Sequence, residues 1–557
     1  MPALQFGFVY DDHKQIVGNS LVHSWASFPQ IFSTFLWNQK FSVGFYYRPI
    51  FSLWLLIVHT FGGLSPWFWH LSSALLHAVA TYCVFRLCLE VLGSQASAAF
   101  AALLFAVHPI HVETVSWVSA SDEILYTLFM LVSLLLFIRT VRAPVDAGRR
   151  TAFSLAAWAL ALLSKETAIA LLPLFFFLAY KSADDSAGRR MRWWRTLQAS
   201  TLFFIVAAVY VGVRFIVLMR SGLEGGSLTW HQVLYTSPSI FVFYLRKLLL
   251  PVGLSEFYAD PVFSAPTLAM WITVLFILVG LVAVVWMALK RDLAFGLAAG
   301  LLFLPIFPVL VGMRLFGRDL AHDRYIYLPS VGACLLAAML AGALWKHGRG
   351  ARIAVAAVAT CVVAVFAVLT LAQQPYYHDD ERLYRRAVEI GPTNVYAIDM
   401  LGDFYYSQGQ LPRAIEQFSR ARDLEPANPR TTVFLVKGLF ASQQYAAVEP
   451  YLQQVVYNPR LPSEQRWELM VALGQTDIEL GHFSAAETVL NRLRSENETY
   501  PNLHLTLAEL YRREGRIPDA QSEYAREFQV SGNAMAEQKA ADLARQMRSN
   551  STNSRTD

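Results

Sequence analysis

The sequence predicts an all-α protein in two parts, a polytopic bundle of membrane helices followed by a soluble α-solenoid. Hydrophobic residues make up 55% of the 557-residue chain, a share too high for an ordinary soluble protein. The long apolar runs lie almost entirely before residue 373. After that point the sequence becomes polar, and small and large apolar residues recur with a period typical of stacked helix pairs.

About ten apolar runs approach the ~20 residues that a helix needs to cross a bilayer. They are expected at 66–92, 94–109, 121–141, 151–163, 165–180, 195–218, 267–289, 293–312, 324–345 and 352–372. Two aromatic, amphipathic segments before them, 25–40 and 46–61, are expected to lie as helices in the membrane surface. The expected organisation is therefore an outer-face region at 1–65 and a transmembrane domain at 66–373.

Four clusters of arginine and lysine decide the expected orientation, because cytoplasmic loops carry an excess of these residues. The clusters lie at 139–150, 181–195, 290–291 and 346–352. With ten spans they all fall on one face, which is then cytoplasmic. The net charge of +5 reflects these loops and gives no reason to expect nucleic-acid binding. The N-terminal segment and the C-terminal third fall on the opposite face.

An acidic pair precedes the first long apolar run. Asp11 and Asp12 end the aromatic segment FGFVYDD, at the edge of a domain in which charge is expensive. A solvated acidic turn is one interpretation. A functional pair is the other, and it is favoured by the polar residues that the expected topology places on the same face.

The runs 151–163 and 165–180 begin and end beside cytoplasmic clusters, so they are expected to form a hairpin. Arms of this length span only ~20–24 Å as helices, which is less than the ~30 Å apolar core. Lys165 and Glu166, in the turn, should therefore lie below the outer surface and face a protein cavity. A structural ion pair between the two is the alternative.

The segment HPIHVE follows the short run 94–109 and should lie at the rim of the same cavity. It supplies His108, His111 and Glu113. Metal ligation is conceivable, since both residue types bind metals. Polar support of the loop is the favoured interpretation, because Pro109 ends the helix and keeps the histidines off a shared helix face.

Positive residues on the outer face predict a site for an anion such as a phosphate. Arg246 lies in the expected outer loop 220–265, and Asp323 and Arg324 lie in GRDLAHDRYIYLPS (317–330). Mutual ion pairing at the mouth of a helix is the alternative.

From residue 376 a 34-residue repeat of tetratricopeptide (TPR) spacing is visible. Its clearest copy contains Leu401, Gly402, Tyr405, Ala414, Phe418, Ala421 and Pro426. The repeat predicts a TPR α-solenoid at 376–545, followed by a disordered tail at 546–557. The signal is specific for the fold and says little about the ligand.

The order of FVYDD, YYRPI, HPIHVETVSWVSASDEIL, SKETA and HDRYIYLPS, followed by TPR repeats, resembles the transmembrane-and-TPR protein O-mannosyltransferases. These belong to the GT-C class of membrane glycosyltransferases. The resemblance spans nearly the whole chain. It implies transfer of a sugar from a polyprenyl-phosphate donor to a protein hydroxyl on the non-cytoplasmic face, with the TPR repeats binding the acceptor polypeptide.

The resemblance also implies roles for single residues. Asp11 and Asp12 correspond to the acidic motif, and one of them, with Asp11 favoured by its position in that motif, would take the proton of the acceptor hydroxyl. Positive charge at the leaving phosphate would come from Lys165, Arg324 and Arg246. Cavity support would come from His108, His111, Glu113, Glu166 and Asp323. No cofactor is certain, and a divalent cation at Asp11 and Asp12 is the one considered.

The family has a transmembrane helix before the acidic motif, whereas this sequence starts after that point. An upstream start is expected, and an untethered loop is the alternative. The short loops favour a bacterial inner membrane, or the endoplasmic reticulum membrane in a eukaryote, with the TPR repeats on the periplasmic or luminal side. Two other functions stay open: a non-enzymatic, membrane-anchored TPR scaffold, and transfer to a lipid or glycan.

Overall fold

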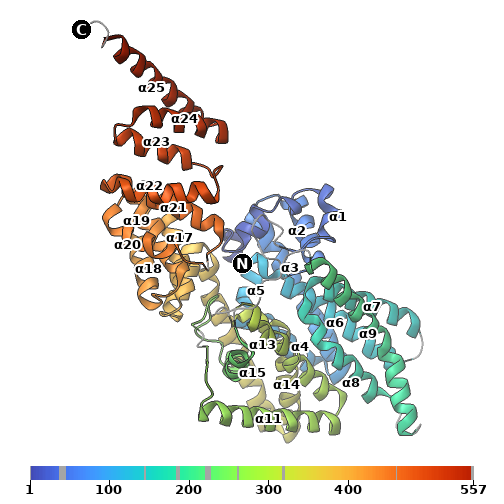
Figure 1. Cartoon of the computed structure of the whole chain (residues 1–557). Coiled ribbons are helices and arrows are strands. Elements are labelled where there is room, and N and C mark those ends of the chain that lie inside the picture. Colours follow the sequence, from blue (N-terminus) through green and yellow to red (C-terminus); the bar gives the residue numbers. More distant parts are fainter. Residues whose placement is uncertain are drawn as a thin grey trace. The chain divides into compact units, whose positions relative to one another are not determined.

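The computed structural model describes residues 2–36, 46–143, 146–183, 188–219, 228–259, 262–316, 320–459 and 461–553. These residues form helices and no strand (Figure 1), which confirms the all-α prediction. The chain divides into two compact units, Met1–Pro392 and Thr393–Asp557.

The first unit contains the apolar part of the chain. Its helices are α1 (Phe28–Ile31), α2 (Pro49–Gly62), α3 (Pro66–Leu92), α4 (Gln95–Ala106), α5 (Val112–Ser116), α6 (Ser121–Arg142), α7 (Ala147–Ser164), α8 (Leu172–Ser182), α9 (Arg189–Leu218), α10 (Trp230–Leu249), α11 (Leu268–Lys290), α12 (Leu293–Phe303), α13 (Ile306–Phe316), α14 (Tyr327–Leu344), α15 (Arg349–Gln373) and α16 (Asp380–Ile390). Because α16 packs with these helices, the unit extends beyond the expected boundary at 373–376.

Seven helical stretches of the described chain are long and apolar enough to cross a membrane, and an eighth results if α4 and the bent segment Pro109–Ser116 count as one span. The chain is therefore a multi-pass membrane protein, with seven or eight such stretches where about ten spans are expected. The two expected spans that fall short are α7 and α8. They are joined by the 3-10 turn Glu166–Leu171 and have 18 and 11 residues.

Helix α10 lies where a loop is expected. Its N-terminus carries a capping box, in which Thr229 and Gln232 exchange hydrogen bonds between side chain and backbone (2.9 and 3.3 Å). The spacing of Thr229 and Gln232 was the sign in the sequence that a helix begins here. Pro238 inside the helix and the polar residues around it hide the helical periodicity.

Aromatic rings hold the short arms α7 and α8 against the rest of the bundle. Phe175 stacks on Phe203 with 4.2 Å between ring centroids, and it meets Phe137 and Trp158 edge-on. The Trp158 indole donates a hydrogen bond to the carbonyl of Phe203 (3.2 Å). Since all four side chains are buried, the turn between α7 and α8 rests on a well-packed base.

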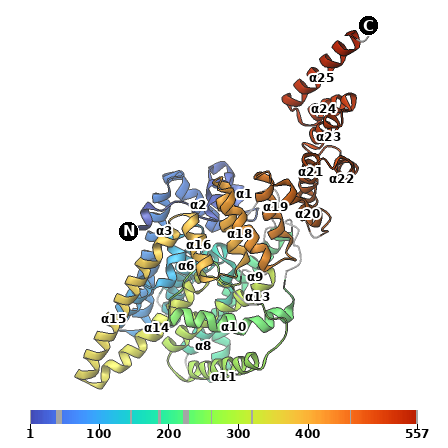
Figure 2. The ribbon, with the colours of Figure 1, turned by 90° about the vertical axis from the view of Figure 1, so that its left-hand side faces the viewer.

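The second unit is a stack of helix pairs, seen in both views (Figures 1 and 2). Its helices are α17 (Val395–Ser407), α18 (Leu411–Leu424), α19 (Pro429–Ala441), α20 (Tyr445–Val456), α21 (Ser463–Leu480), α22 (Phe483–Glu496), α23 (Leu503–Arg513), α24 (Ile517–Ser531) and α25 (Ala534–Asn553). Gly402 and Gly474 leave room for Phe418 and Leu490, which would lie 2.5 and 2.7 Å from an added Cβ. This pairing of small and large residues confirms the TPR prediction.

Two expected segments differ in the structure. The helix expected at 25–40 is a 3-10 turn at Trp25–Ser27 followed by α1, which ends at Ile31, and residues 37–45 lie outside the described part. In the tail expected to be disordered (546–557), the backbone of α25 stays helical to Asn553, and residues 554–557 lie outside the described part.

Close packing of α12 on α14 depends on one glycine. A Cβ at Gly332 would lie 2.4 Å from the carbonyl oxygen of Ala298 and 2.6 Å from the amide nitrogen of Leu302. Both atoms belong to backbone, which cannot move aside as a side chain can. Small residues permit such close approach between membrane helices.

We expect Gly332→Ala to lower the free energy of unfolding by about 1–3 kcal/mol through overpacking. The measurement is the thermal unfolding midpoint of the purified protein in detergent. Gly280→Ala in α11 is the matched control, because a Cβ there meets nothing within 4 Å, and alanine raises helix propensity at both positions. Equal midpoints for the two variants would contradict this account.

Candidate functional site

The segment that carries the acidic pair is held by the last turns of the membrane unit. Gly7 N donates to the carbonyl oxygen of His378 (3.0 Å), and Tyr10 N donates to Asp380 Oδ1 (2.8 Å). The His13 ring contacts the other Asp380 oxygen (2.8 Å), and this hydrogen bond raises the pKa of His13 above its usual value. Tyr10 adopts a φ of 50°, which turns the chain sharply at the start of the pair.

Asp12 is fully buried and both of its oxygens accept hydrogen bonds. Oδ2 accepts from Val9 N (3.2 Å), and Oδ1 accepts from the amide (2.8 Å) and the hydroxyl (2.5 Å) of Ser119. Burial raises the pKa of Asp12 to about 6, and the hydrogen bonds from Ser119 oppose that shift. Asp12 therefore ties the N-terminal segment to the start of α6, which is a positioning role.

Asp11 is in a different position. Its side chain is half-buried, and it makes no hydrogen bond to any residue in the described part of the chain. Burial raises the pKa of Asp11 to about 7, with the charge of Arg324 opposing the shift and that of Glu256 adding to it. A carboxylate with a pKa near neutrality can both exist ionised and accept a proton.

Arg324, whose charge acts on Asp11, lies in the short 3-10 turn Asp323–Ile326, which leads into α14. Its Nη1 contacts Glu113 Oε1 (2.6 Å) and Glu256 Oε1 (2.8 Å). The guanidinium carbon lies 4.8 Å from the ring centre of Trp117 and 5.0 Å from that of Tyr325. The predicted phosphate-binding residue is therefore already oriented by two carboxylates and two aromatic rings.

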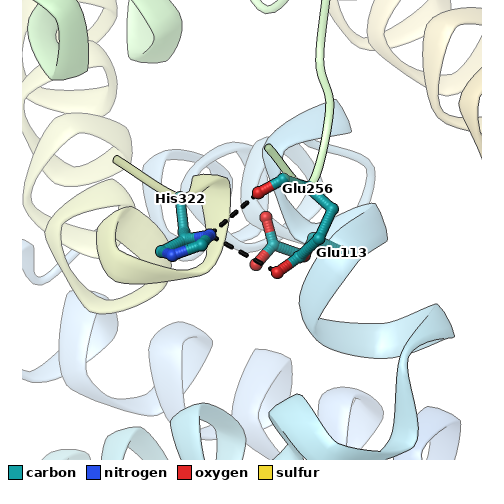
Figure 3. Close-up of side chains that lie close together, drawn as sticks. All are labelled: Glu113, Glu256 and His322. Carbon is teal, nitrogen blue, oxygen red and sulfur yellow. Dashed lines mark hydrogen bonds and ion pairs between the residues drawn. The ribbon is translucent and has the colours of Figure 1, made fainter. Parts of the chain in front are cut away.

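Glu256 and His322 join Glu113 in this cluster (Figure 3). His322 belongs to the segment GRDLAHDRYIYLPS that predicts an anion site, whereas sequence reasoning missed Glu256. His322 Nδ1 lies 2.9 Å from the carbonyl oxygen of Glu256 and 3.4 Å from its Oε1. The available signal was the acidic residue within LSEFY of the outer loop. The predicted Asp323 accepts a hydrogen bond from the hydroxyl of Tyr258 (2.7 Å), which fixes the turn before Arg324.

Lys165 lies where the hairpin argument expects it, buried in the turn between α7 and α8. Its partners are Asp122 (3.3 Å) and, through a short hydrogen bond, Glu123. It also lies 5.4 Å from the ring centre of Tyr325. The alternative of an ion pair with Glu166 is therefore not what the structure shows: Lys165 binds the first turn of α6 instead.

Glu166 is paired with arginines that sequence reasoning did not single out. Arg48 binds it through two hydrogen bonds (2.6 and 3.0 Å) and reaches Asp122 with a third (2.7 Å). Arg214 lies 3.5 Å away on the other side. The signals for them were the YYRPI motif and a charge inside an apolar run. Together with Lys165 and Glu123 they form a network of balanced charge.

The two predicted histidines hold the loop after α4. His108 contacts the carbonyl of Leu248 (3.1 Å) with Nε2, and His111 contacts the hydroxyl of Ser330 (2.8 Å). These contacts link the loop to α10 and α14. Arg246 is exposed and forms no ion pair with any described residue, so the structure does not bring it into the Arg324 cluster.

The cation considered at Asp11 and Asp12 finds little support in this geometry. Both oxygens of Asp12 are occupied by hydrogen bonds, so only Asp11 would be available as a ligand. What the arrangement offers instead is one proton-accepting carboxylate beside one firmly oriented guanidinium. That combination suits a reaction in which a hydroxyl attacks and an anion leaves.

We expect Ser119→Ala to destabilise the protein by about 1–3 kcal/mol, because the buried Oδ1 of Asp12 then loses the hydrogen bond from the Ser119 hydroxyl. Thermal unfolding in detergent measures the effect. Ser116→Ala is the matched control, since the buried hydroxyl of Ser116 has no hydrogen-bond partner in the described residues. An equally small change in both variants would show that Asp12 does not depend on Ser119.

Comparison with known proteins gives a consistent result. Residues 47–211 match the family described as dolichyl-phosphate-mannose-protein mannosyltransferase. Protein O-mannosyl-transferase F38B6.6 of Caenorhabditis elegans is 26% identical over 456 residues, covering 75% of this chain and 60% of that protein. Protein O-mannosyl-transferase TMTC1 of Homo sapiens is 25% identical, covering 76% of this chain and 53% of that protein.

A shorter match, to protein O-mannosyl-transferase tmtc2 of Xenopus laevis, is 36% identical over 135 residues, 24% of this chain and 16% of that protein. Among solved structures, the TPR protein YrrB covers 29% of this chain and 81% of its own, with 17% identity and a TM-score of 0.27. The chain spans about three fifths of the length of its Caenorhabditis elegans relative. It is thus a relative of the protein O-mannosyl-transferases, with TPR repeats after its membrane domain.

Proposed function

We propose that this protein is a membrane glycosyltransferase that moves a sugar from a polyprenyl-phosphate donor to a hydroxyl group of a protein. The similarity to protein O-mannosyl-transferases supports the reaction class. The observation that carries the proposal is that Asp11 is a half-buried carboxylate near enough to the guanidinium of Arg324 for that charge to lower its pKa. An acid–base group and an anion-binding group are the two parts that the reaction requires.

In the proposed reaction the acceptor oxygen forms a bond to C1 of the sugar while the bond from C1 to the phosphate oxygen breaks. The hydroxyl proton passes to Asp11, and the electron pair of the broken bond stays on the leaving polyprenyl phosphate. Arg324 stabilises the negative charge that develops there. Since Glu113 and Glu256 already hold the guanidinium, it is oriented before the donor arrives.

The charge-balanced network around Lys165 adjoins the same site, because Lys165 and Arg324 both lie against the ring of Tyr325. Lys165 is only 3% exposed, and its ammonium group is shared by Asp122 and Glu123. We propose that it contributes to the positive potential at the phosphate while it also anchors the turn between α7 and α8. Arg246 has no part in this proposal, because it is exposed and lacks an ion pair among the described residues.

The acceptor polypeptide is proposed to bind the TPR unit. A groove of about 590 Å³ runs along α21, α23 and α25, and its lining includes Phe440, Tyr445, Tyr524 and Lys539. Aromatic and charged side chains in one groove suit an extended peptide. Within this proposal the TPR unit and the acidic pair share the non-cytoplasmic face, which is periplasmic in a bacterial inner membrane and luminal in the endoplasmic reticulum.

We expect Asp11→Asn to lower sugar transfer by a factor of about 10²–10⁴, the usual contribution of a general base, with donor binding retained. The assay follows radiolabelled mannose from polyprenyl-phosphate mannose to protein in membranes that contain the full chain. Glu389→Gln, on the exposed side of α16, is the control. Full activity of Asp11→Asn would exclude this residue as the base, and a non-enzymatic scaffold predicts no donor-dependent transfer by either protein.

The same assay has a predicted pH dependence. The base must be ionised, and burial raises the pKa of Asp11 to about 7. The ratio kcat/KM should therefore be constant above pH 7 and fall about tenfold for each pH unit below it. A profile that stays flat down to pH 5 would contradict this role for Asp11.

Sidedness can be tested by labelling with a membrane-impermeant thiol reagent. Gln95→Cys, at the start of α4, should be protected in sealed right-side-out vesicles, and Ser407→Cys, at the end of α17, should react. Both substitutions are made in a Cys361→Ser background, because Cys361 is the exposed native cysteine among the described residues. The reverse pattern, labelling at 95 and protection at 407, would place the TPR unit in the cytoplasm.

A further inference from the structure

Three side chains converge from distant parts of the membrane unit. Glu113 lies in α5 and Glu256 in the segment after α10. His322 immediately precedes the turn Asp323–Ile326 (Figure 3). All three are at most 2% exposed. One ligand atom from each lies within 4.8 Å of the others, which is a separation that a single metal ion can bridge.

The two carboxylates are not satisfied by their present partners. Each uses one oxygen to contact the same Nη1 of Arg324. The second oxygen of each, Oε2, is buried without a hydrogen-bond partner in the described part of the chain. A buried acceptor without a partner is costly, and two of them in one cluster indicate that a ligand belongs there.

The local charge points to a cation. When both are ionised, Glu113 and Glu256 carry two negative charges against the single positive charge of the Arg324 guanidinium that they share. The network around Lys165 differs, because Arg48, Lys165 and Arg214 there balance three carboxylates. Of these two buried networks, the Glu113 cluster is therefore the one with an excess of carboxylates.

We propose that Glu113, Glu256 and His322 bind one divalent transition-metal ion of the zinc or manganese type. Two carboxylate oxygens and one imidazole nitrogen form a mixed set that suits these ions better than magnesium or calcium, which prefer oxygen alone. Three protein ligands leave a coordination position open, as in catalytic metal sites. When the metal binds, His322 Nδ1 gives up its contact with the carbonyl oxygen of Glu256 and coordinates the metal instead.

Such an ion would add positive charge next to Arg324, where the proposed reaction releases a phosphate. This consequence rests on the proposed function, whereas the binding site itself does not. The inference assigns the cation to Glu113, Glu256 and His322 and assigns no ligand role to Asp11.

The test measures the metal content of the purified full chain by mass spectrometry. The protein is first stripped with EDTA, then reloaded with Zn²⁺ or Mn²⁺, and then freed of excess ion. We expect about one equivalent per chain. Glu256→Gln and His322→Gln should each retain less than about one tenth of that, and Asp11→Asn should retain it fully. Thermal unfolding checks that each variant is folded, and Glu113→Gln replaces any variant that is not.

A second cluster of the same composition, Glu449, Asp477 and His482, lies in the TPR unit, so His482→Ala is the matched control and should keep the metal. Loss of the ion in His482→Ala, loss in Asp11→Asn, or no stable binding by the wild type would each overturn the inference. The result is separable from the proposed function: a metal-loaded chain that transfers no sugar leaves the site intact, and a chain that transfers sugar but binds no ion removes the site alone.

Discussion

The two ion pairs of the Arg324 guanidinium are the interaction on which the rest of the membrane unit depends. Its Nη1 joins Glu113 and Glu256, which lie 211 and 68 residues away along the chain. Removing charges from water costs several kcal/mol for each ion, so none of the three could be buried alone. The loop after α4, the segment after α10 and the entry to α14 must therefore fold around one another.

The buried charges divide into two groups with different properties. Around Lys165, Arg48 and Arg214, positive and negative charges are equal, and α2, α6, α7 and α9 are held together by them. Around Arg324, carboxylates are in excess and some of their oxygens lack partners. A balanced network is suited to hold a framework, whereas an unbalanced one retains the capacity to bind or react.

Local patterns in the sequence predicted much of the fold. The TPR repeat was recognisable because small and large residues recur at a fixed period, as Gly402 and Phe418 do. The short hairpin with Lys165 was predicted from the basic clusters at both of its ends and from the thickness of the bilayer. Helix α10 was missed because Pro238 interrupts its periodicity.

The site was less predictable. The sequence indicates which charges are buried, but their pairing depends on which turns meet in space. An ion pair of Lys165 with its neighbour Glu166 was therefore one of the alternatives, although Lys165 binds Asp122 and Glu123. Glu256 was missed because its role depends on Arg324 and Glu113, both far away in the chain. The resemblance favoured Asp11 over Asp12 as the base, but the hydrogen bonds from Ser119 to Asp12 are visible only in the structure.

The contacts of the acidic segment with His378 and Asp380 have a consequence for biosynthesis. A ribosome makes residues 7–13 before the helices of the membrane unit, but the partners of these residues at 378–380 emerge only after those helices have been made. The nascent chain thus inserts its helices while Asp11 is still unplaced, and the carboxylate reaches its position in one late step. The proposed site is therefore complete only on a chain whose membrane unit is finished.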